Sequence, residues 1–442
     1  MRDHLPNSTA ATPATNACHR QTCAVLIVGG GPAGIAAAVT ASAAGLATVL
    51  IDEGLAPGGQ IWRGSTVTSP GTAGYWLRAL TASSVTVLSR GRVVAHPEPG
   101  TVMCETPDGP LVITYRRAVL CPGARELFLP FPGWTLPGVS GAGGLQALMK
   151  GGLPVADKRV VIAGTGPLLL AVARSLGQAG ARIELLADQA PAAQVRRFAL
   201  SLWRHPGKAL QALTLAPQAL RLQHDTWVLR AEGGQHLEQV VITRRGRQET
   251  IACDYLACGF GLIPNTELPA LFGCRIDQGR VVVDDLLRSS RQDVLCAGEV
   301  LGIGGVDAAL IEGRLAGHVA AEQITQAGAL LRARAGIRAF AELIERGFAL
   351  RPELKQLAAP DVLLCRCEDV TAGAVAACHS WREARLLTRC GMGTCQGRIC
   401  GAAARFLHGW NSTTARPPLQ PTSLDHLRLP QPDQSVLQET HP

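Results

Sequence analysis

Four cysteines near the C-terminus have the residue type and spacing of a metal–sulfur site. Cys365 and Cys367 form a Cys-x-Cys pair, and Cys395 and Cys400 form a Cys-x4-Cys pair, with 27 residues between the two pairs. Thiolates are soft ligands that suit iron–sulfur clusters or Zn²⁺, and the glycines of GMGTCQGRIC give the backbone freedom for four sulfurs to converge. Zinc, and buried thiols without a metal, stay open as alternatives.

The remaining cysteines do not repeat this pattern. The chain has 14 cysteines without any Cys-x-x-Cys among them, which disfavours a disulfide reductase with a redox dithiol. We interpret Cys378 and Cys390 as non-ligands beside the site, and Cys253 and Cys258 as core thiols. The first twenty residues lack the apolar stretch of a signal peptide, which predicts a reducing, cytoplasmic compartment in which clustered cysteines are ligands rather than disulfides.

A glycine fingerprint near the N-terminus predicts a dinucleotide site. Gly29-x-Gly31-x-x-Gly34 follows the apolar run 24–28 and opens an Ala-rich helix over 32–44, and a second strand follows. In such a βαβ unit the first glycine permits the turn, the second lets backbone approach a pyrophosphate, and the third lets helix and strand pack closely. The free N–H groups and positive dipole of the helix N-terminus then face the phosphates.

An acid at the end of the second strand should bond a ribose hydroxyl. Asp52 and Glu53 both stand at this place. We favour Glu53 because of its spacing to Gly58 and Gly59, and Asp52 stays open as the alternative.

Three further segments resemble flavoproteins with two dinucleotide domains, such as the thioredoxin reductase group. They are the loop GGQ at 58–60, the segment RRAVLCPGARELFLPFPG, in which Cys121-Pro122 stands where Ala-Thr usually precedes the glycine, and VLCAGEV at 294–300. This resemblance implies FAD. The residues it implies for the FAD site, together with the fingerprint and both acids, are Gly29, Gly31, Pro32, Ala33, Gly34, Asp52, Glu53, Gly59, Gln60, Gly123, Gly298 and Glu299.

A second fingerprint, about 135 residues further on, is defective. Gly164-x-Gly166 is followed by Leu169 at the third glycine position, where a large side chain should push the helix from its strand. The next strand ends at Asp188 without an Arg placed for a 2′-phosphate, which disfavours NADP(H). Three possibilities stay open for this unit: a packing role without ligand, NAD(H), or another adenine nucleotide.

The cysteine motifs carry a closer resemblance. Cys-x-Cys-Glu-Asp-Val-Thr with GMGTCQGRIC resembles the bacterioferritin-associated-ferredoxin-like [2Fe–2S] module of a bacterial family that includes opine (octopine and nopaline) oxidase, hydrogen cyanide synthase and heteromeric proline or hydroxyproline dehydrogenases. CGFGLIPNTEL and GIGGVDAALIEGRLAG also resemble that family, so the similarity spans about residues 23–410. It implies a [2Fe–2S] cluster on the four cysteines, and a partner flavoprotein subunit, related to D-amino-acid and sarcosine oxidases, that oxidises the substrate. A small ferredoxin-like subunit is a further candidate partner.

The predicted fold class is α/β, with two Rossmann-like dinucleotide-binding domains of the glutathione and thioredoxin reductase type and a small α-helical four-cysteine [2Fe–2S] domain. The chain of 442 residues is long enough for several cores. The expected parts are a flexible N-terminal segment (1–22), the first part of an FAD-binding domain (23–150), a degenerate second dinucleotide-binding-like domain (151–284), the FAD domain's return segment (285–325), a helical connector (326–360), the cluster domain (361–412) and a Pro-rich tail (413–442).

Charge and hydropathy limit the partners. The net charge of +8 comes from scattered residues, mostly Arg, without a basic run, so we expect no nucleic-acid site. The uncharged stretch 23–51 is broken by glycines and fits a strand, a turn and a helix better than a membrane span. We expect at most peripheral contact with the inner membrane, through the electron acceptor.

These features predict an electron-transferring FAD-dependent oxidoreductase subunit that works with a partner on amines or imino acids of the opine, proline, hydroxyproline or glycine type. We assign no catalytic base or nucleophile, since an electron carrier requires none. Two rivals stay open: a self-sufficient NAD(P)H-dependent flavoprotein reductase, and a scaffold in which both cofactor sites are vestigial.

Overall fold

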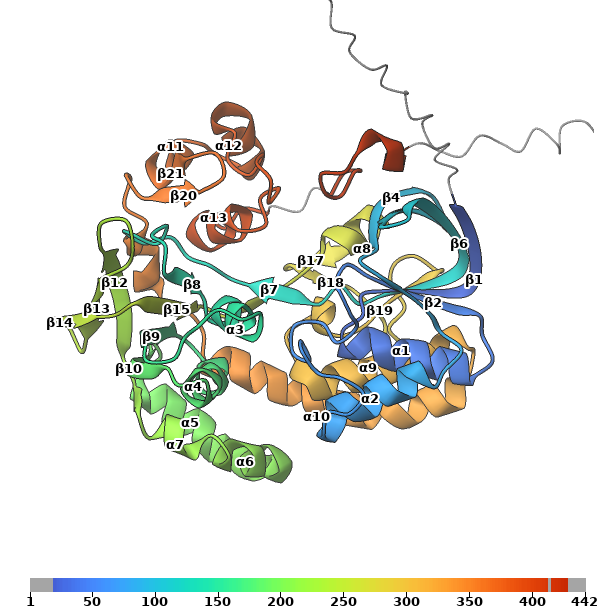
Figure 1. The fold of residues 1–442 in the computed structure, drawn as a ribbon, viewed down its shortest axis with the longest axis horizontal. Coiled ribbons are helices and arrows are strands. Elements are labelled where there is room, and N and C mark those ends of the chain that lie inside the picture. The colour runs from blue at the N-terminus through green and yellow to red at the C-terminus, as the bar shows by residue number, and fades with distance from the viewer. Residues whose placement is uncertain (1–18, 412–414, 428–442) are drawn as a thin grey trace, which may run out of the picture.

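The computed structural model describes residues 19–411 and 415–427. Most of the segment expected to be flexible (1–22), and much of the Pro-rich tail (413–442), lie outside the described residues. Two α/β units lie side by side, and a small module that carries the cysteines sits against the second unit (Figure 1). We call them the first unit, the second unit and the cysteine module.

The first unit is built on a sheet of seven strands with the order β3-β2-β1-β6-β5-β4, and β19 also pairs with β6. The strands β1, β2, β3, β6 and β19 are parallel, whereas β4, β5 and β6 form an antiparallel meander. The bounds are β1 His19–Val28, β2 Thr48–Asp52, β3 Thr86–Ser89, β4 Arg92–Glu98, β5 Thr101–Thr106, β6 Gly109–Leu120 and β19 Val294–Cys296. Such apolar parallel strands are buried because helices cover the sheet.

Helices α1 (Pro32–Ala43), α2 (Gly71–Thr81) and α9 (Gly305–Ala320) lie against this sheet (Figure 1). Small residues bring α1 and α9 into close contact: a Cβ placed at Gly313 would lie 2.1 Å from the carbonyl oxygen of Ala33. The two helices therefore hold the first glycine loop and the VLCAGEV segment in fixed relation.

The second unit repeats the βαβ arrangement. Its parallel sheet has the order β11-β10-β9-β15-β8, and an antiparallel sheet β12-β13-β14 packs beside it. The strands are β8 Val139–Gly141, β9 Arg159–Gly164, β10 Arg182–Asp188, β11 Leu222–Gln223, β12 Thr226–Glu232, β13 Gln239–Arg244, β14 Arg247–Ala252 and β15 Tyr255–Gly259. The helices are α3 Ala142–Lys150, α4 Leu168–Gln178, α5 Ala192–Ser201, α6 Pro206–Leu213 and α7 Ala216–Ala219.

The chain passes between the units twice, through β7 (Ala124–Glu126) and β16 (Leu262–Pro264). These two strands pair with each other in antiparallel register, so the crossings form a two-stranded ribbon. The short helix α8 (Glu267–Leu271) follows β16. β7 begins directly after Gly123 of the predicted FAD site, and it leads toward the cysteine module.

A long helix, α10 (Ile324–Gly347), runs from the first unit to the second (Figure 1). Helix α9 ends at Ala320, because the chain turns at Glu322, whose φ is +60°. A 3₁₀ turn, Pro352–Leu357, then leads into the cysteine module.

The cysteine module is a small core of its own, with a hairpin as well as helices. Its elements are β20 Leu363–Cys365, β21 Val370–Thr371, α11 Ala372–Ala376, α12 Trp381–Thr388 and α13 Cys400–His408. Trp381, Val375 and Leu364 are buried together with several of the cysteines. After the module, residues 415–427 cross back to the first unit (Figure 1), where the N–H of Leu419 donates to the carbonyl oxygen of Val94 at 2.9 Å. We call this segment the strap.

Strand β6 is continuous over the apolar runs 111–114 and 118–120, because residues 111–120 lie along β1. The short strand β18 (Arg280–Val281) pairs with β17 (Ile276–Asp277). Among the described helices, none combines the length and the apolar character that crossing a membrane requires.

Candidate functional site

The first glycine loop has the geometry of a pyrophosphate cradle. Gly29 has φ +105°, and a Cβ there would collide with the carbonyl oxygen of Cys121 at 2.2 Å. A Cβ at Gly34 would lie 1.8 Å from the carbonyl oxygen of Gly29, so helix α1 meets the loop at backbone distance. A Cβ at Gly31, by contrast, would meet no atom of the described chain within 4 Å. Space beside Gly31 and the N-terminus of α1 therefore fits a phosphate group.

The two acids after β2 have different surroundings. Asp52 accepts hydrogen bonds from the backbone N–H groups of Gly30 and Gly54, so its carboxylate holds the glycine loop and the next turn. Glu53 is exposed, and the side-chain amide of Gln420 in the strap donates to its carboxylate at 3.5 Å, a long and weak contact. Glu53 is thus the acid with a carboxylate available for a ribose.

The later motifs of the predicted FAD site meet this loop. Cys121 donates its N–H to the carbonyl oxygen of Val28 at 2.8 Å, which brings the 121–123 turn beside the first glycine. Gly123 has φ +70° and open space where a side chain would stand. A Cβ at Gly298 would lie 2.9 Å from the Cβ of Ala33 on α1. Three segments far apart in the sequence therefore surround one position.

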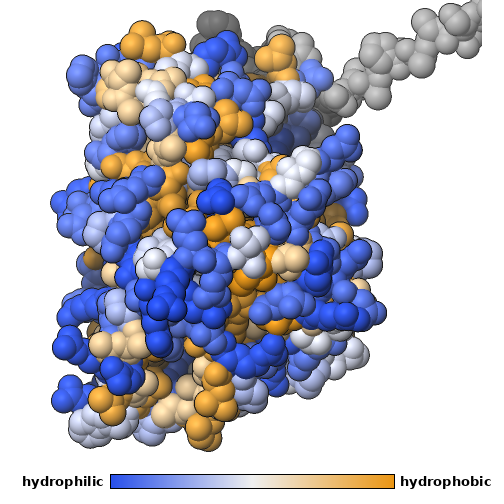
Figure 2. All heavy atoms as spheres, turned by 90° about the vertical axis from the view of Figure 1, so that its left-hand side faces the viewer, coloured by the Kyte–Doolittle hydropathy of each residue, from blue (hydrophilic) through white to orange (hydrophobic). Residues whose placement is uncertain are grey.

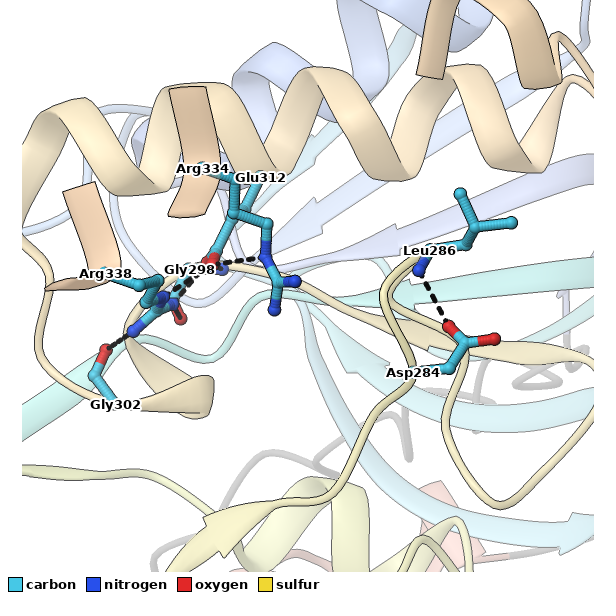
Figure 3. Close-up of polar contacts among 7 residues, drawn as sticks. All are labelled: Asp284, Leu286, Gly298, Gly302, Glu312, Arg334 and Arg338. Atoms are coloured by element: carbon cyan, nitrogen blue, oxygen red, sulfur yellow. Dashed lines mark hydrogen bonds and ion pairs between the residues drawn. The ribbon is translucent and has the colours of Figure 1, made fainter. Parts of the chain in front are cut away.

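The Gly298–Glu299 turn is held by a buried ion pair that sequence reasoning missed. Glu312 on α9 is fully buried, accepts the N–H of Gly298 at 3.0 Å, and pairs with Arg338 and Arg334 of α10 (Figure 3). Arg338 also donates to the carbonyl oxygens of Gly298 and Gly302. An acidic residue within the otherwise small and apolar run GVDAALIEGRLAG could have pointed to a buried role for Glu312. Nothing in the sequence around Arg338 pointed to its contact with this turn.

Burial raises the pKa of Glu299, and the positive charge of Arg338 counteracts part of that rise. The carboxyl group is half-buried and stands at the position predicted for the ribityl chain, where a hydroxyl group would be a hydrogen-bond partner.

The second glycine loop is covered by the chain itself. Thr165 donates its hydroxyl to the carbonyl oxygen of Phe348 at 3.2 Å, and a Cβ at Gly166 would meet Phe348 at 3.8 Å. Gln189 donates to the carbonyl oxygen of Ala349 and accepts the N–H of Arg351, both at 3.0 Å. The segment 348–351, directly after α10, thus lies over the second loop, where a nucleotide's pyrophosphate would approach.

The second loop tolerates Leu169 because its neighbour is a glycine. Leu169 is fully buried, and a Cβ at Gly259 would lie 2.6 Å from its side chain. The space that the third glycine of a fingerprint normally leaves open is here taken by a leucine packed against Gly259 of β15.

The cysteine module brings sulfur atoms together around Cys400. The sulfurs of Cys365, Cys390 and Cys400 all lie within 4.8 Å of one another. A hydrogen bond with Cys400, together with burial, raises the pKa of Cys395 to about 12. Cys367 is exposed, with its sulfur 3.8 Å from the hydroxyl of Thr394.

A cavity of about 490 Å³ opens between the cysteine module and the β7 ribbon. All four cysteines of the predicted ligand set line it, whereas Cys390 does not. Its other walls include Arg125, Glu126 and Ser140 of the two α/β units. Of these four, Cys365 and Cys400 belong to the group of sulfurs within 4.8 Å of one another, whereas Cys367 and Cys395 line the cavity outside that group. Thiols are the donor type that an iron–sulfur cluster takes.

The cysteines predicted not to be ligands are buried. Cys378 lies between α11 and α12, and its thiol contacts the carbonyl oxygen of Ala374. Cys253 and Cys258 are buried in the core of the second unit, and burial raises the pKa of both thiols, which leaves them protonated and unreactive at neutral pH. The sequence placed Cys390 beside the site, and the structure adds that its sulfur lies within 4.8 Å of those of Cys365 and Cys400.

Comparison with known proteins agrees with this geometry. A profile of the pyridine nucleotide-disulphide oxidoreductase family matches residues 23–327, which is most of the two α/β units. The chain belongs to this family. It is accordingly an FAD-dependent oxidoreductase.

Relatives of this oxidoreductase cover nearly the whole chain. It is 33% identical to a subunit of opine oxidase from Rhizobium meliloti strain 1021, over 90% of this chain and 97% of that protein. It is 30% identical to hydrogen cyanide synthase subunit HcnB of Pseudomonas aeruginosa, over 85% of this chain and 90% of the relative. L-Proline dehydrogenase from P. horikoshii has a similar fold, with a TM-score of 0.68 at 20% identity over 93% of this chain and 80% of that one.

The predictions of family and fold class are therefore confirmed. Both curated relatives are named as subunits, one of an opine oxidase and one of a hydrogen cyanide synthase. The assignment of individual ligands remains a prediction, to which the structure adds the geometry of the cavity and the proximity of Cys390.

Proposed function

We propose that the chain is the electron-transferring FAD and [2Fe–2S] subunit of a heteromeric amine or imino-acid dehydrogenase or oxidase. The observation that carries this proposal is one cavity lined by four cysteines, reached from the FAD motif by the short strand β7, in a chain whose second nucleotide loop is covered. Under this proposal, the flavin and the cluster both hold electrons. The second glycine loop, where a nicotinamide nucleotide would bind, is covered by Phe348.

The chain's residues fit both cofactors. The N-terminus of α1 and Gly31 bind the pyrophosphate of FAD, Glu53 bonds the ribose, and Gly298–Glu299 receives the ribityl region. Bound FAD accepts electrons in pairs, and a [2Fe–2S] cluster accepts them singly, so together they divide a two-electron oxidation into one-electron steps.

We assign the cluster to Cys365, Cys367, Cys395 and Cys400. These four line the cavity, whereas Cys390, whose sulfur lies within 4.8 Å of those of Cys365 and Cys400, does not. Replacement of any one of the four by serine should abolish the visible absorbance of the cluster and lower bound iron, whereas Cys390→Ser should retain both. If Cys390→Ser loses iron and Cys367→Ser does not, the ligand set is Cys365, Cys390, Cys395 and Cys400 instead.

We propose that electrons come from a partner protein. Large apolar side chains on α5, on α6 and on the turn between them are exposed: Leu200, Trp203, Leu210 and Leu213 have 66–74% of their surface accessible. On the side of the second unit and the cysteine module, apolar residues form a broken band between charged ones (Figure 2). Exposed apolar area of this kind is typical of protein interfaces and supports a partner on this side.

The substrate class follows from the relatives, which are named for opine oxidase and hydrogen cyanide synthase. We propose that the partner oxidises an opine, glycine, proline or hydroxyproline. Co-purification of the chain with the products of neighbouring genes, followed by assay of dye reduction with each of these substrates, tests this. Activity of the isolated chain on any of them would contradict the division of labour.

The rival is a self-sufficient NAD(P)H-dependent reductase. It predicts that NADH or NADPH bleaches the flavin of the purified chain without oxygen. With Phe348 over the second glycine loop, we expect no bleaching by either nucleotide, and full bleaching by the partner together with its substrate. A preparation without flavin, iron or sulfide would instead indicate a vestigial scaffold.

A further inference from the structure

The strand β7 joins the two proposed cofactor sites, and Arg125 stands at its centre. Arg125 follows Gly123 by two residues and lines the cavity of the four cysteines. Its side chain is 22% exposed, and its guanidinium forms a bidentate pair with Glu267 at 2.8 and 3.1 Å. A bidentate pair fixes the plane of the guanidinium and leaves its remaining N–H groups aimed in set directions.

On the flavin side, Arg125 acts through Asn265. Arg125 donates to the side-chain oxygen of Asn265 at 2.7 Å. Asn265 in turn donates its side-chain N–H to the carbonyl oxygen of Pro122 at 2.9 Å, and its backbone N–H to that of Gly123 at 3.0 Å. The turn predicted to contact the flavin is therefore fixed by the residue that Arg125 orients.

On the cysteine side, the Nε of Arg125 donates to the carbonyl oxygen of Arg398 at 3.0 Å. Arg398 lies between Cys395 and Cys400, and its own guanidinium donates to the carbonyl oxygen of Cys395 at 3.3 Å. Three hydrogen bonds thus connect the carbonyl of Pro122, through Asn265 and Arg125, with the loop that holds two of the proposed cluster ligands.

We propose that Arg125 is a positioning residue that fixes this ligand loop against the flavin turn and so governs electron transfer between the two centres. The inference rests on the proposed function for its electron-transfer part. Its structural part, the rigidity of the ligand loop, stands on the contacts alone.

A second contact keeps the module docked when Arg125 changes. The indole N–H of Trp134 in the second unit donates to the carbonyl oxygen of Leu363 at 2.7 Å, at the start of β20. Loss of Arg125 should therefore loosen the ligand loop without releasing the module, which separates positioning from general structural support.

The test uses Arg125→Lys in the full chain. A lysine can reach Glu267, but it cannot also bond Asn265 and Arg398 in fixed directions. We expect unchanged flavin, iron and sulfide, about tenfold faster hydrogen–deuterium exchange in the segment 396–401, and about tenfold slower bleaching of the cluster after photochemical reduction of the flavin. Glu267→Gln, which keeps the Nε bond, should give a smaller change of the same kind.

The matched control is Arg159→Lys. Arg159 pairs with Asp254 at 2.8 Å in the second unit, away from both loops. Its replacement should alter neither hydrogen–deuterium exchange over 396–401 nor the rate of electron transfer.

If Arg125→Lys leaves both quantities unchanged, the positioning role is refuted. If Arg125→Lys loses iron while Glu267→Gln changes nothing, Arg125 serves cluster assembly instead. A wild-type chain without flavin or iron would refute the proposed function. The exchange measurement would still test whether Arg125 fixes the segment 396–401.

Discussion

The two glycine loops of this chain share the first two glycines of one motif, but they differ in what lies beside the second glycine. A Cβ at Gly31 would meet nothing in the described chain within 4 Å, whereas one at Gly166 would meet Phe348. Both loops sit on a parallel strand, with a helix behind them. The fold places a glycine loop at the end of a parallel strand in both units. In the first unit the space beside the loop is open, whereas in the second unit Phe348 occupies it.

The residues after the second strand show the same contrast. Asp52 and Asp188 both bond backbone N–H groups of their own glycine loop. The next residue, Glu53, keeps an exposed carboxylate, whereas Gln189 is buried and bonds the backbone at Ala349 and Arg351. In the second unit, the place of the proposed ribose ligand is thus taken by a residue that binds peptide groups. The second unit therefore serves as a binding surface for the chain's own linker.

The largest effect should come from closing the first loop. Gly34→Ala places a Cβ on the carbonyl oxygen of Gly29, which should cost about 3 kcal/mol of unfolding free energy and yield protein with little flavin. Urea unfolding and flavin absorbance measure this. Gly177→Ala, in α4 with open space beside it, is the control and should stabilise by about 0.5–1 kcal/mol. Full flavin content in Gly34→Ala would show that FAD does not approach α1 here.

Opening the second loop should weaken the fold and spare the flavin. Gln189→Ala leaves the N–H of Arg351 and the carbonyl oxygen of Ala349 without their side-chain partner, at a cost of about 2 kcal/mol of unfolding free energy. Flavin and iron content should stay at wild-type values. Loss of flavin in this variant would mean that the two loops are not independent.

A smaller effect is expected at the ribose position of the first loop. Glu53→Gln should lower FAD affinity about tenfold, since one charge-assisted hydrogen bond is lost. Fluorescence titration of the flavin-free protein measures it. The matched variant Gln189→Glu should leave FAD affinity unchanged, and equal losses in the two variants would contradict the contrast between the loops.

The smallest effect is a pH dependence at Asp188. Burial raises the pKa of this carboxyl group, although the N–H groups of Ala190 and Gly166 offset part of the rise. The native state then binds the proton more tightly than the unfolded state, so stability falls as pH rises from the unfolded pKa through the folded one. Asp188→Asn should lack this slope in urea unfolding between acid and neutral pH, and parallel curves for both proteins would contradict it.

Local features of the sequence predicted the elements that carry the chemistry. The strand β1, the glycine turn and α1 follow from adjacent residues, because their geometry is fixed by apolar runs and the absence of side chains. The cover over Gly166 could not be predicted in this way, since Phe348 lies far along the chain. The same holds for Arg338 beside Gly298, and for Cys390 beside Cys365 and Cys400, where folding, not spacing, sets the distance.

The strap gives the cysteine module a second attachment. The linker before the module is bound to the second unit through Gln189, and the strap after it is bound to the first unit through Val94 and Arg92. A body tethered at both ends cannot swing as a domain on one flexible hinge does. Under the proposed function, an electron acceptor would therefore have to approach the module itself while the strap is in place.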